Sequence, residues 1–192
     1  MEQRWRRRLT ALCVVSLVLL GTLPSTAGAG QPRVGGTMRF ALEGEPPTLD
    51  PHWATATVVM TVGSHWLETL FTQGAKYEII PDLAEGYTTS NDLKAYEIAL
   101  RKGVLFHNGK EMTSADVVAS LDRWGQAATN GKSFYRNVEK VEGVDKYKVR
   151  ITLKGGSAVV PALLTWNGRS FIYPKEVVDE VGIKGPVKTY IG

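Results

Sequence analysis

The sequence has few of the side chains on which most catalytic and metal sites depend. It contains 192 residues, with one cysteine and three histidines. Cys13 lies in an apolar segment near the amino terminus, so the rest of the chain has no residue for a disulfide or a thiolate site. His52, His65 and His107 are not paired at a metal-ligand spacing. We therefore predict no metal site and expect each histidine to be an ordinary hydrogen-bonded residue.

Catalytic motifs are also absent from the sequence. It contains no G-x-S-x-G motif, Walker loop, H-E-x-x-H motif or Rossmann fingerprint. Glu43 and Glu45 are two residues apart after a predicted strand, which is a common spacing in loops. We assign no catalytic residue and no cofactor, and we predict that the chain is not an enzyme. An exported hydrolase is the alternative.

An excess of one charge is largely confined to the first residues. The formal net charge is +4, but four arginines lie within the first eight residues. Residues 30–192 contain 19 basic and 18 acidic residues, so this part has no strongly basic surface to bind nucleic acid. We therefore expect no nucleic-acid partner.

Residues 1–29 are organised like a secretory signal peptide. The arginines precede an uncharged run from Leu9 to Leu20, and Ala27 and Ala29 provide the small residues of a cleavage site. The apolar run is shorter than the ~20 residues that cross a bilayer, although an uncleaved anchor is the alternative. We expect export to the periplasm.

Hydropathy patterns after the leader predict a mixed α/β (α+β) chain. Tyr147 to Leu153 alternates strictly between apolar and polar residues, as a half-buried strand does. Thr113 with Asp116 three residues later is typical of a helix start. The full prediction has strands at 37–42, 76–80, 87–90, 94–100, 138–144, 147–153 and 166–173, helices at 54–71, 113–125, 157–164 and 174–182, a helical turn at 81–85, a hairpin turn at 108–109 and a polar loop at 126–136.

Tryptophans are spread along the chain and suggest two different roles. Trp66 and Trp124 recur at helical spacing with other apolar residues, which indicates packing in the core. Trp53 and Trp166 lie beside predicted turns, which makes them candidates for facing a cleft.

Several segments share the order and spacing of one protein family. They are GGTMR at 35–39, PTLDP at 47–51, ETL at 68–70, PDLAE at 81–85 and the dense run 96–120, which includes LRKGV, FHNG and TSADVV. Together they resemble the start of an extracytoplasmic solute-binding protein of family 5, the oligopeptide, dipeptide and nickel class of ABC-importer receptors. Asn108 stands where the family often has aspartate, and Gly86-Tyr87 where it has a small residue and Trp.

The resemblance implies part of a two-lobed fold like that of periplasmic binding proteins. Residues 30–67 would form the first strand and helix of lobe one, residues 68–180 its smaller subdomain, and residues 181–192 a truncated return segment. The second lobe would be absent, so we expect this chain to bind no peptide tightly. A stand-alone envelope interaction module is another alternative.

The resemblance also implies a function and a set of contacts. The family binds a peptide or other small solute and delivers it to an ABC permease in the membrane, and we expect a monomer. The segment after Leu-Asp-Pro lines the cleft, which here gives Thr55, Ala56 and Thr57. The loop at Trp166 and Asn167 is the second candidate. A plain helix start or strand end is the alternative for each.

Overall fold

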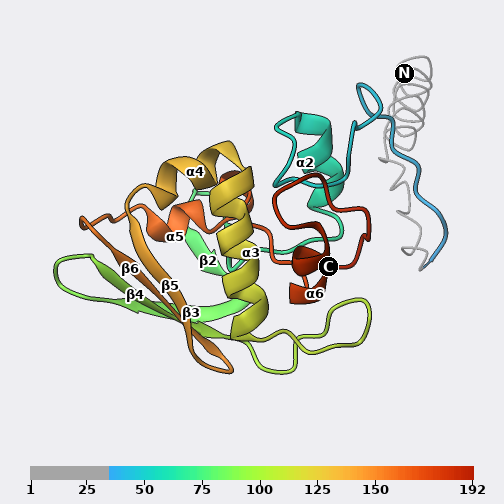
Figure 1. The fold of residues 1–192 in the computed structure, drawn as a ribbon. Coiled ribbons are helices and arrows are strands. Elements are labelled where there is room, and N and C mark those ends of the chain that lie inside the picture. Colours follow the sequence, from blue (N-terminus) through green and yellow to red (C-terminus); the bar gives the residue numbers. More distant parts are fainter. Residues whose placement is uncertain (1–34) are drawn as a thin grey trace, which may run out of the picture. The chain divides into compact units, whose positions relative to one another are not determined.

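A computed structural model describes residues 35–192, and the predicted signal peptide at 1–29 lies outside them. The chain divides into two compact units, Met1–Phe40 and Ala41–Gly192. In the first unit, residues 35–40 are exposed and belong to no helix or strand. All helices and strands given below belong to the second unit (Figure 1).

The second unit is built from helices and antiparallel strands, which confirms the mixed α/β class. The main sheet has four strands in the order β3-β4-β6-β5, and β1 pairs with β2 in a separate two-stranded sheet. In chain order the elements are α2 (Thr57–Gly63), β1 (Phe71–Gln73), β2 (Ile79–Pro81), β3 (Ala84–Thr89), β4 (Ala95–Leu100), α3 (Ser114–Ala127), α4 (Thr129–Tyr135), β5 (Val138–Asp145), β6 (Lys148–Leu153), α5 (Val160–Leu163), the 3-10 helix η1 (Trp166–Gly168) and α6 (Lys175–Val181).

The alternating sequence of the central strands gives the main sheet one buried and one wet face. Along β6, Val149, Ile151 and Leu153 are buried, and the residues between them are partly exposed. Opposite on β4, Ile98 pairs with Val149. On the wet face Arg150 is within ion-pair distance of glutamates on both neighbouring strands. Both predicted strand pairs of this sheet are confirmed.

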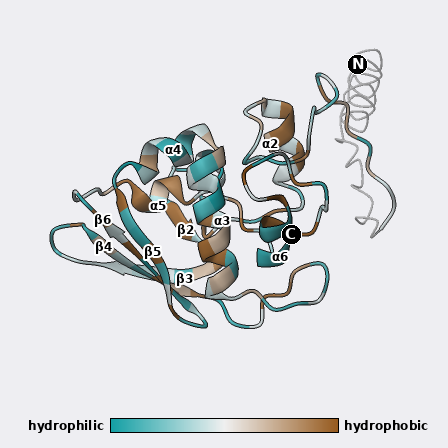
Figure 2. Ribbon diagram, viewed as in Figure 1, coloured by the Kyte–Doolittle hydropathy of each residue, from teal (hydrophilic) through white to brown (hydrophobic). Residues whose placement is uncertain are grey.

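Helix α3 lies against the buried face of the sheet (Figure 1). At its start the Asp116 carboxylate accepts hydrogen bonds from the backbone N–H and the hydroxyl of Thr113, both at 2.8 Å, so the predicted cap is confirmed. Figure 2 shows both hydrophobic and hydrophilic residues along α3, as expected for a helix with one buried side. No helix in the described residues is long and apolar enough to cross a membrane.

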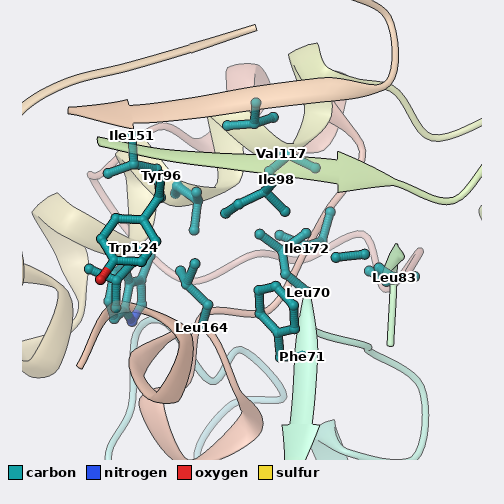
Figure 3. Packing of buried hydrophobic residues seen from close by; sticks show 14 of the residues in the cluster. Leu70, Phe71, Leu83, Tyr96, Ile98, Val117, Trp124, Ile151, Leu164 and Ile172 are labelled. Carbon is teal, nitrogen blue, oxygen red and sulfur yellow. The ribbon is translucent and has the colours of Figure 1, made fainter. Parts of the chain in front are cut away.

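The main core lies between α3, the sheet and the chain around α5. Figure 3 shows Val117 and Trp124 of α3 meeting Tyr96 and Ile98 of β4 there. Trp124 is completely buried, so its predicted core role is confirmed. A second cluster joins α2 to α6; its buried members are Met60, Leu67, Phe171, Tyr173, Val177, Val178 and Val187. Trp66 is partly buried and packs against this second cluster.

Two predictions near the start of the described chain are wrong. Residues 37–42 form no strand, and Met38 is 76% exposed and Phe40 65% exposed. An alternating pattern predicts a buried face, but a strand also needs a continuous ladder of backbone hydrogen bonds, and neither sheet of the described chain includes residues 37–42. The helix predicted at 54–71 is shorter in the structure, where α2 ends at Gly63. The chain leaves the helix after this point, since Leu67 packs in the second cluster and Leu70 in the main core.

Three later predictions are also wrong. Residues 81–85 form no helical turn, because Pro81 ends β2 and Ala84 begins β3. The loop predicted at 126–136 contains α4, whose Phe134 packs on Trp124 with ring centroids 5.8 Å apart. The strand predicted at 166–173 is η1 followed by an extended segment that joins no sheet in the described chain.

The remaining predicted elements are confirmed with shorter or shifted bounds. The strand expected at 76–80 is β2, and the helix expected at 157–164 is α5. The helix after Pro174 is α6, and Gly182 follows it with a φ of 55°. The Asn108-Gly109 turn forms, with the Phe106 N–H donating to the Lys110 carbonyl at 2.8 Å.

Candidate functional site

The two segments predicted to contact solute lie side by side in the structure. Arg169, which follows η1, donates from Nη1 to the Ala54 carbonyl at 2.9 Å and from Nη2 to the Thr55 carbonyl at 2.8 Å. Its backbone has a φ of 63°, which turns the chain back after Gly168. One side chain therefore ties the loop at Trp166 and Asn167 to the start of α2.

All five predicted contact residues lie on the surface. Thr55, Ala56 and Thr57 are exposed, and α2 begins at Thr57. The hydroxyls of Thr55 and Thr57 form no hydrogen bond with another described residue. Trp166 is 42% exposed, as is Trp53. Asn167 is exposed too, but its amide donates to the side-chain oxygen of Gln73.

The loop that carries Trp166 is held in place by contacts with α3 and α5. The indole N–H of Trp124 donates to the Gly168 carbonyl at 2.9 Å. A Cβ on Gly168 would lie 1.8 Å from the Leu163 carbonyl oxygen, which is an impossible contact. Only glycine therefore lets η1 pack this closely on α5.

A buried ion pair fixes the segment that precedes Thr55. Arg123 of α3 donates from Nη2 to Oδ2 of Asp50 at 2.6 Å, and the two side chains are 1% and 0% exposed. The same carboxylate accepts the Tyr173 hydroxyl at 2.9 Å and the Val187 N–H at 2.9 Å. Arg123 also donates to the carbonyls of Gly182 and Gly185, so the pair connects four separate parts of the chain.

The charges in this cluster shift the pKa values of its members. Burial raises the pKa of the Asp50 carboxyl, but the hydrogen bond and charge of Arg123 outweigh it and hold the pKa below its usual value. Burial and the Asp50 charge raise the pKa of Tyr173 well above its ordinary value. Asp50 is therefore ionised and Tyr173 neutral at pH 7.

His52 donates its backbone N–H to Oδ1 of Asp50 at 3.0 Å, and its ring lies beside the ion pair. It is 1% exposed, neither ring nitrogen makes a hydrogen bond of good geometry with a residue of 35–192, and its ring meets the Tyr173 ring edge-on with centroids 5.0 Å apart. Burial lowers its pKa to about 3, although the Asp50 charge opposes the change. The imidazole is therefore neutral at pH 7. The expectation of a hydrogen-bonded loop residue is confirmed for the backbone N–H of His52 and not for its ring.

The sequence predictions missed four residues of this site: Asp50, Arg123, Arg169 and Tyr173. Asp50 was noticed only within the PTLDP segment, with no role attached. No local signal distinguishes Arg123 either, because the charged Asp122 precedes it directly. No local pattern marks Arg169, because its partners lie more than 100 residues away. No group of three potential metal ligands occurs in the described residues.

Comparison with known proteins identifies the family of the chain. Residues 78–189 match the family described as bacterial extracellular solute-binding proteins, family 5 Middle. The chain belongs to this family. The resemblance noted in the sequence is thereby confirmed.

Relatives within family 5 include proteins named for different solutes. The glutathione-binding protein GsiB of Salmonella choleraesuis is 35% identical over 130 residues, which are 67% of this chain and 25% of GsiB. MoaA of A. tumefaciens R10, solved with mannopinic acid, is 33% identical with a TM-score of 0.67, over 76% of this chain and 30% of MoaA. OppA of Haemophilus influenzae, solved with the peptide RPPGFSPFR, is 26% identical with a TM-score of 0.67, over 77% of this chain and 33% of OppA.

The family 5 chain described here spans about a quarter of the length of the curated relatives. It covers about 30% of the length of the solved periplasmic binding proteins that it resembles. The prediction that the chain forms part of the periplasmic-binding-protein fold is thereby confirmed.

Proposed function

We propose that this chain is part of the solute-receiving subunit of an ABC importer and that Thr55, Ala56, Thr57, Trp166 and Asn167 contact the solute. The observation that carries the proposal is the pair of hydrogen bonds from Arg169 to the Ala54 and Thr55 carbonyls. These bonds combine two sequence-distant segments into one surface, which we call the contact surface (residues 53–57 and 166–169).

The chemistry of the contact surface suits a ligand with peptide-like polar groups. The hydroxyls of Thr55 and Thr57 have no partner among the described residues and offer both donors and acceptors. The half-exposed indole of Trp166 supplies apolar area beside them. A small number of polar groups that converge beside an aromatic side chain is typical of small-molecule binding sites.

A peptide or peptide-like solute is our preferred class. GsiB is named for glutathione, and the OppA structure contains a peptide. We further propose a periplasmic location, a monomeric state, an ABC permease as partner and no enzymatic activity. Family membership supports the location and the solute-binding role, because the family is described as extracellular and solute-binding.

Fluorine NMR of the tryptophans tests the proposal. In the chain labelled with 5-fluorotryptophan, trialanine or reduced glutathione should shift the Trp166 and Trp53 signals, because both indoles are 42% exposed at the contact surface. Trp124 is completely buried and provides the internal control. Single Trp→Phe variants assign the signals.

Two results would contradict the proposed function. One is that no exposed tryptophan signal moves with either solute up to tens of millimolar. The other is that Trp166→Phe leaves the midpoint of the Trp53 shift unchanged while Thr57→Val also has no effect. The expected result is a weakened midpoint in both variants, because each removes a solute contact.

A further inference from the structure

The sequence contains three asparagines that are followed by glycine: Asn108, Asn130 and Asn167. Such a pair is chemically labile, because glycine has no side chain to keep its backbone nitrogen away from the side-chain amide carbon of the asparagine. Attack of the nitrogen on that carbon forms a five-membered imide and releases the side-chain nitrogen as ammonia. Water then opens the imide to aspartate or isoaspartate. The two atoms have to meet, so the fold decides which pair reacts.

Two of the three pairs are held in packed helical segments. Gly131 lies in α4, where a Cβ would be 2.0 Å from the Trp124 carbonyl oxygen. Gly168 lies in η1, where a Cβ would be 1.8 Å from the Leu163 carbonyl oxygen. Both glycines are buried. The backbone of either pair therefore cannot rotate into the imide geometry without displacing the neighbouring chain.

The pair Asn108-Gly109 lies in an exposed hairpin turn and has no such restraint. Nothing lies within 4 Å of a Cβ built on Gly109, whose φ of 80° is one that glycine adopts readily. The Gly109 N–H donates to the Phe106 carbonyl at 2.8 Å, and the attack has to break this bond. The glycine backbone has the room to do so.

Neighbouring groups also activate the side-chain amide of Asn108. Its Oδ1 accepts the Lys110 backbone N–H at 3.0 Å. This donor stabilises the negative charge that develops on Oδ1 when the Gly109 nitrogen adds to Cγ. On the other side, Nδ2 donates to Oε1 of Glu176 at 3.1 Å, and the same oxygen accepts Lys110 Nζ at 2.7 Å. The ammonium group and the nitrogen that must take up a proton before it leaves therefore share one oxygen.

We propose that Asn108 is a site of spontaneous deamidation in the folded chain and that Asn130 and Asn167 are not. The Gly109 N–H gives its proton to hydroxide, and its nitrogen forms a bond to Asn108 Cγ. The Cγ–Nδ2 bond breaks as Nδ2 takes up a proton and leaves as ammonia. One water molecule then adds across the imide, so the net change is the loss of ammonia and the gain of water. This inference does not depend on the proposed function.

The product changes the link between the hairpin turn and α6. Aspartate suits the turn itself, because Asp-Gly fits the same turn geometry as Asn-Gly. The new carboxylate has no N–H to donate to Glu176, so one hydrogen bond is replaced by two carboxylates that compete for Lys110. Deamidation therefore weakens the contact of the turn with α6.

Peptide mapping by mass spectrometry tests the proposal on the 192-residue chain, stored at pH 7 in native buffer and in concentrated urea. In native buffer, Asn108 should convert at least about tenfold faster than Asn130 or Asn167, a factor that corresponds to a barrier difference of about 1.4 kcal/mol. In urea the three pairs should convert at similar rates, because glycine follows each asparagine.

Three results would overturn the site. They are equal rates for the three pairs in native buffer, faster conversion of Asn130 or Asn167 there, or the same order of rates in urea as in native buffer. The last result would mean that the sequence around each pair, and not the fold, sets the rate.

The effect on α6 is tested with variants. Asn108→Asp should lower the urea midpoint of unfolding, whereas the same substitution in a Glu176→Gln background should not, because glutamine donates to the new carboxylate. Asn130→Asp is the matched control and should not lower the midpoint, because it adds a negative charge in the first turn of α4. An equal loss from Asn108→Asp in both backgrounds would contradict the predicted effect on the contact with α6.

Discussion

At the scale of single residues, the most consequential feature is the buried pair of Asp50 and Arg123. Both side chains are almost fully removed from water, and each makes further hydrogen bonds to distant parts of the chain. Removing one partner of such a pair leaves an uncompensated buried charge, which costs far more than losing a surface ion pair.

Arg123→Met should therefore destabilise the fold by about 3–5 kcal/mol, because Asp50 would stay buried without its cation. Urea unfolding followed by circular dichroism measures this. The control is Lys175→Met, which removes the exposed pair between Lys175 and Asp179 and should cost less than about 1 kcal/mol. Equal losses in the two variants would show that the buried pair does not hold the segment before Thr55.

The lowered pKa of His52 makes the free energy of unfolding depend on pH. Its folded pKa is about 3, below the ordinary value of 6.5, so the unfolded chain binds a proton that the folded chain does not. Stability should fall as the pH drops from 6.5 towards 3, by about 1.4 kcal/mol per pH unit. Asp50, whose pKa is also lowered, adds a loss only below about pH 4.

The measurement is urea unfolding at several pH values between 7 and 4. His52→Phe should flatten the slope between pH 6 and 4.5, because the titrating group is gone, while the exposed His107→Gln should keep it. A slope that is the same in His52→Phe and in the unmodified chain would contradict the assignment of the buried neutral imidazole.

At the scale of elements, the short helix η1 decides where Trp166 and Arg169 lie. Gly168→Ala should destabilise the chain by about 1–3 kcal/mol and displace the loop, because the new Cβ overlaps the Leu163 carbonyl oxygen. Gly185→Ala is the matched control, since nothing lies within 4 Å of a Cβ there. Thermal unfolding measures the stability, and the Trp166 fluorine signal reports the loop. An unshifted signal and an unchanged midpoint would be the contrary result.

The start of α3 offers a second test at this scale. Thr113→Ala removes the hydroxyl that donates to Asp116, and we expect a loss of about 1 kcal/mol in unfolding free energy. Thr189→Ala, at an exposed position outside any helix or strand, should change stability by less than about 0.5 kcal/mol. A neutral Thr113→Ala would mean that packing alone fixes the start of this helix.

Elements whose signal is local could be predicted from the sequence, and elements that depend on distant partners could not. The alternation in β6 and the cap of α3 lie within a few residues, and both predictions are confirmed. Residues 170–173 belong to no strand of either sheet. Their backbone hydrogen bonds are isolated ones to distant segments and not a ladder; for example, the Ile172 N–H donates to the Glu68 carbonyl. The polar segment 129–135 is helical because Phe134 packs on Trp124. The helix propensities of its residues do not include this tertiary contact.

At the scale of the whole molecule, the second unit has two hydrophobic clusters that share one extended segment. Ile172 belongs to the main core, whereas Phe171 and Tyr173 on either side of it belong to the second cluster. This segment directly follows Arg169, so both clusters help to fix the contact surface. The family resemblance predicted the architecture, but Arg169 as the link between the two contact segments is visible only in three dimensions.

Residues 53–57 and 166–169 are proposed to form one solute-contacting surface. Amide NMR of the 15N-labelled chain titrated with trialanine reports on both segments at once. We expect shifts that cluster in both segments and follow one common midpoint, with little change on the wet face of the main sheet around Glu97 and Arg150. Shifts confined to that face, or different midpoints for the two segments, would contradict it.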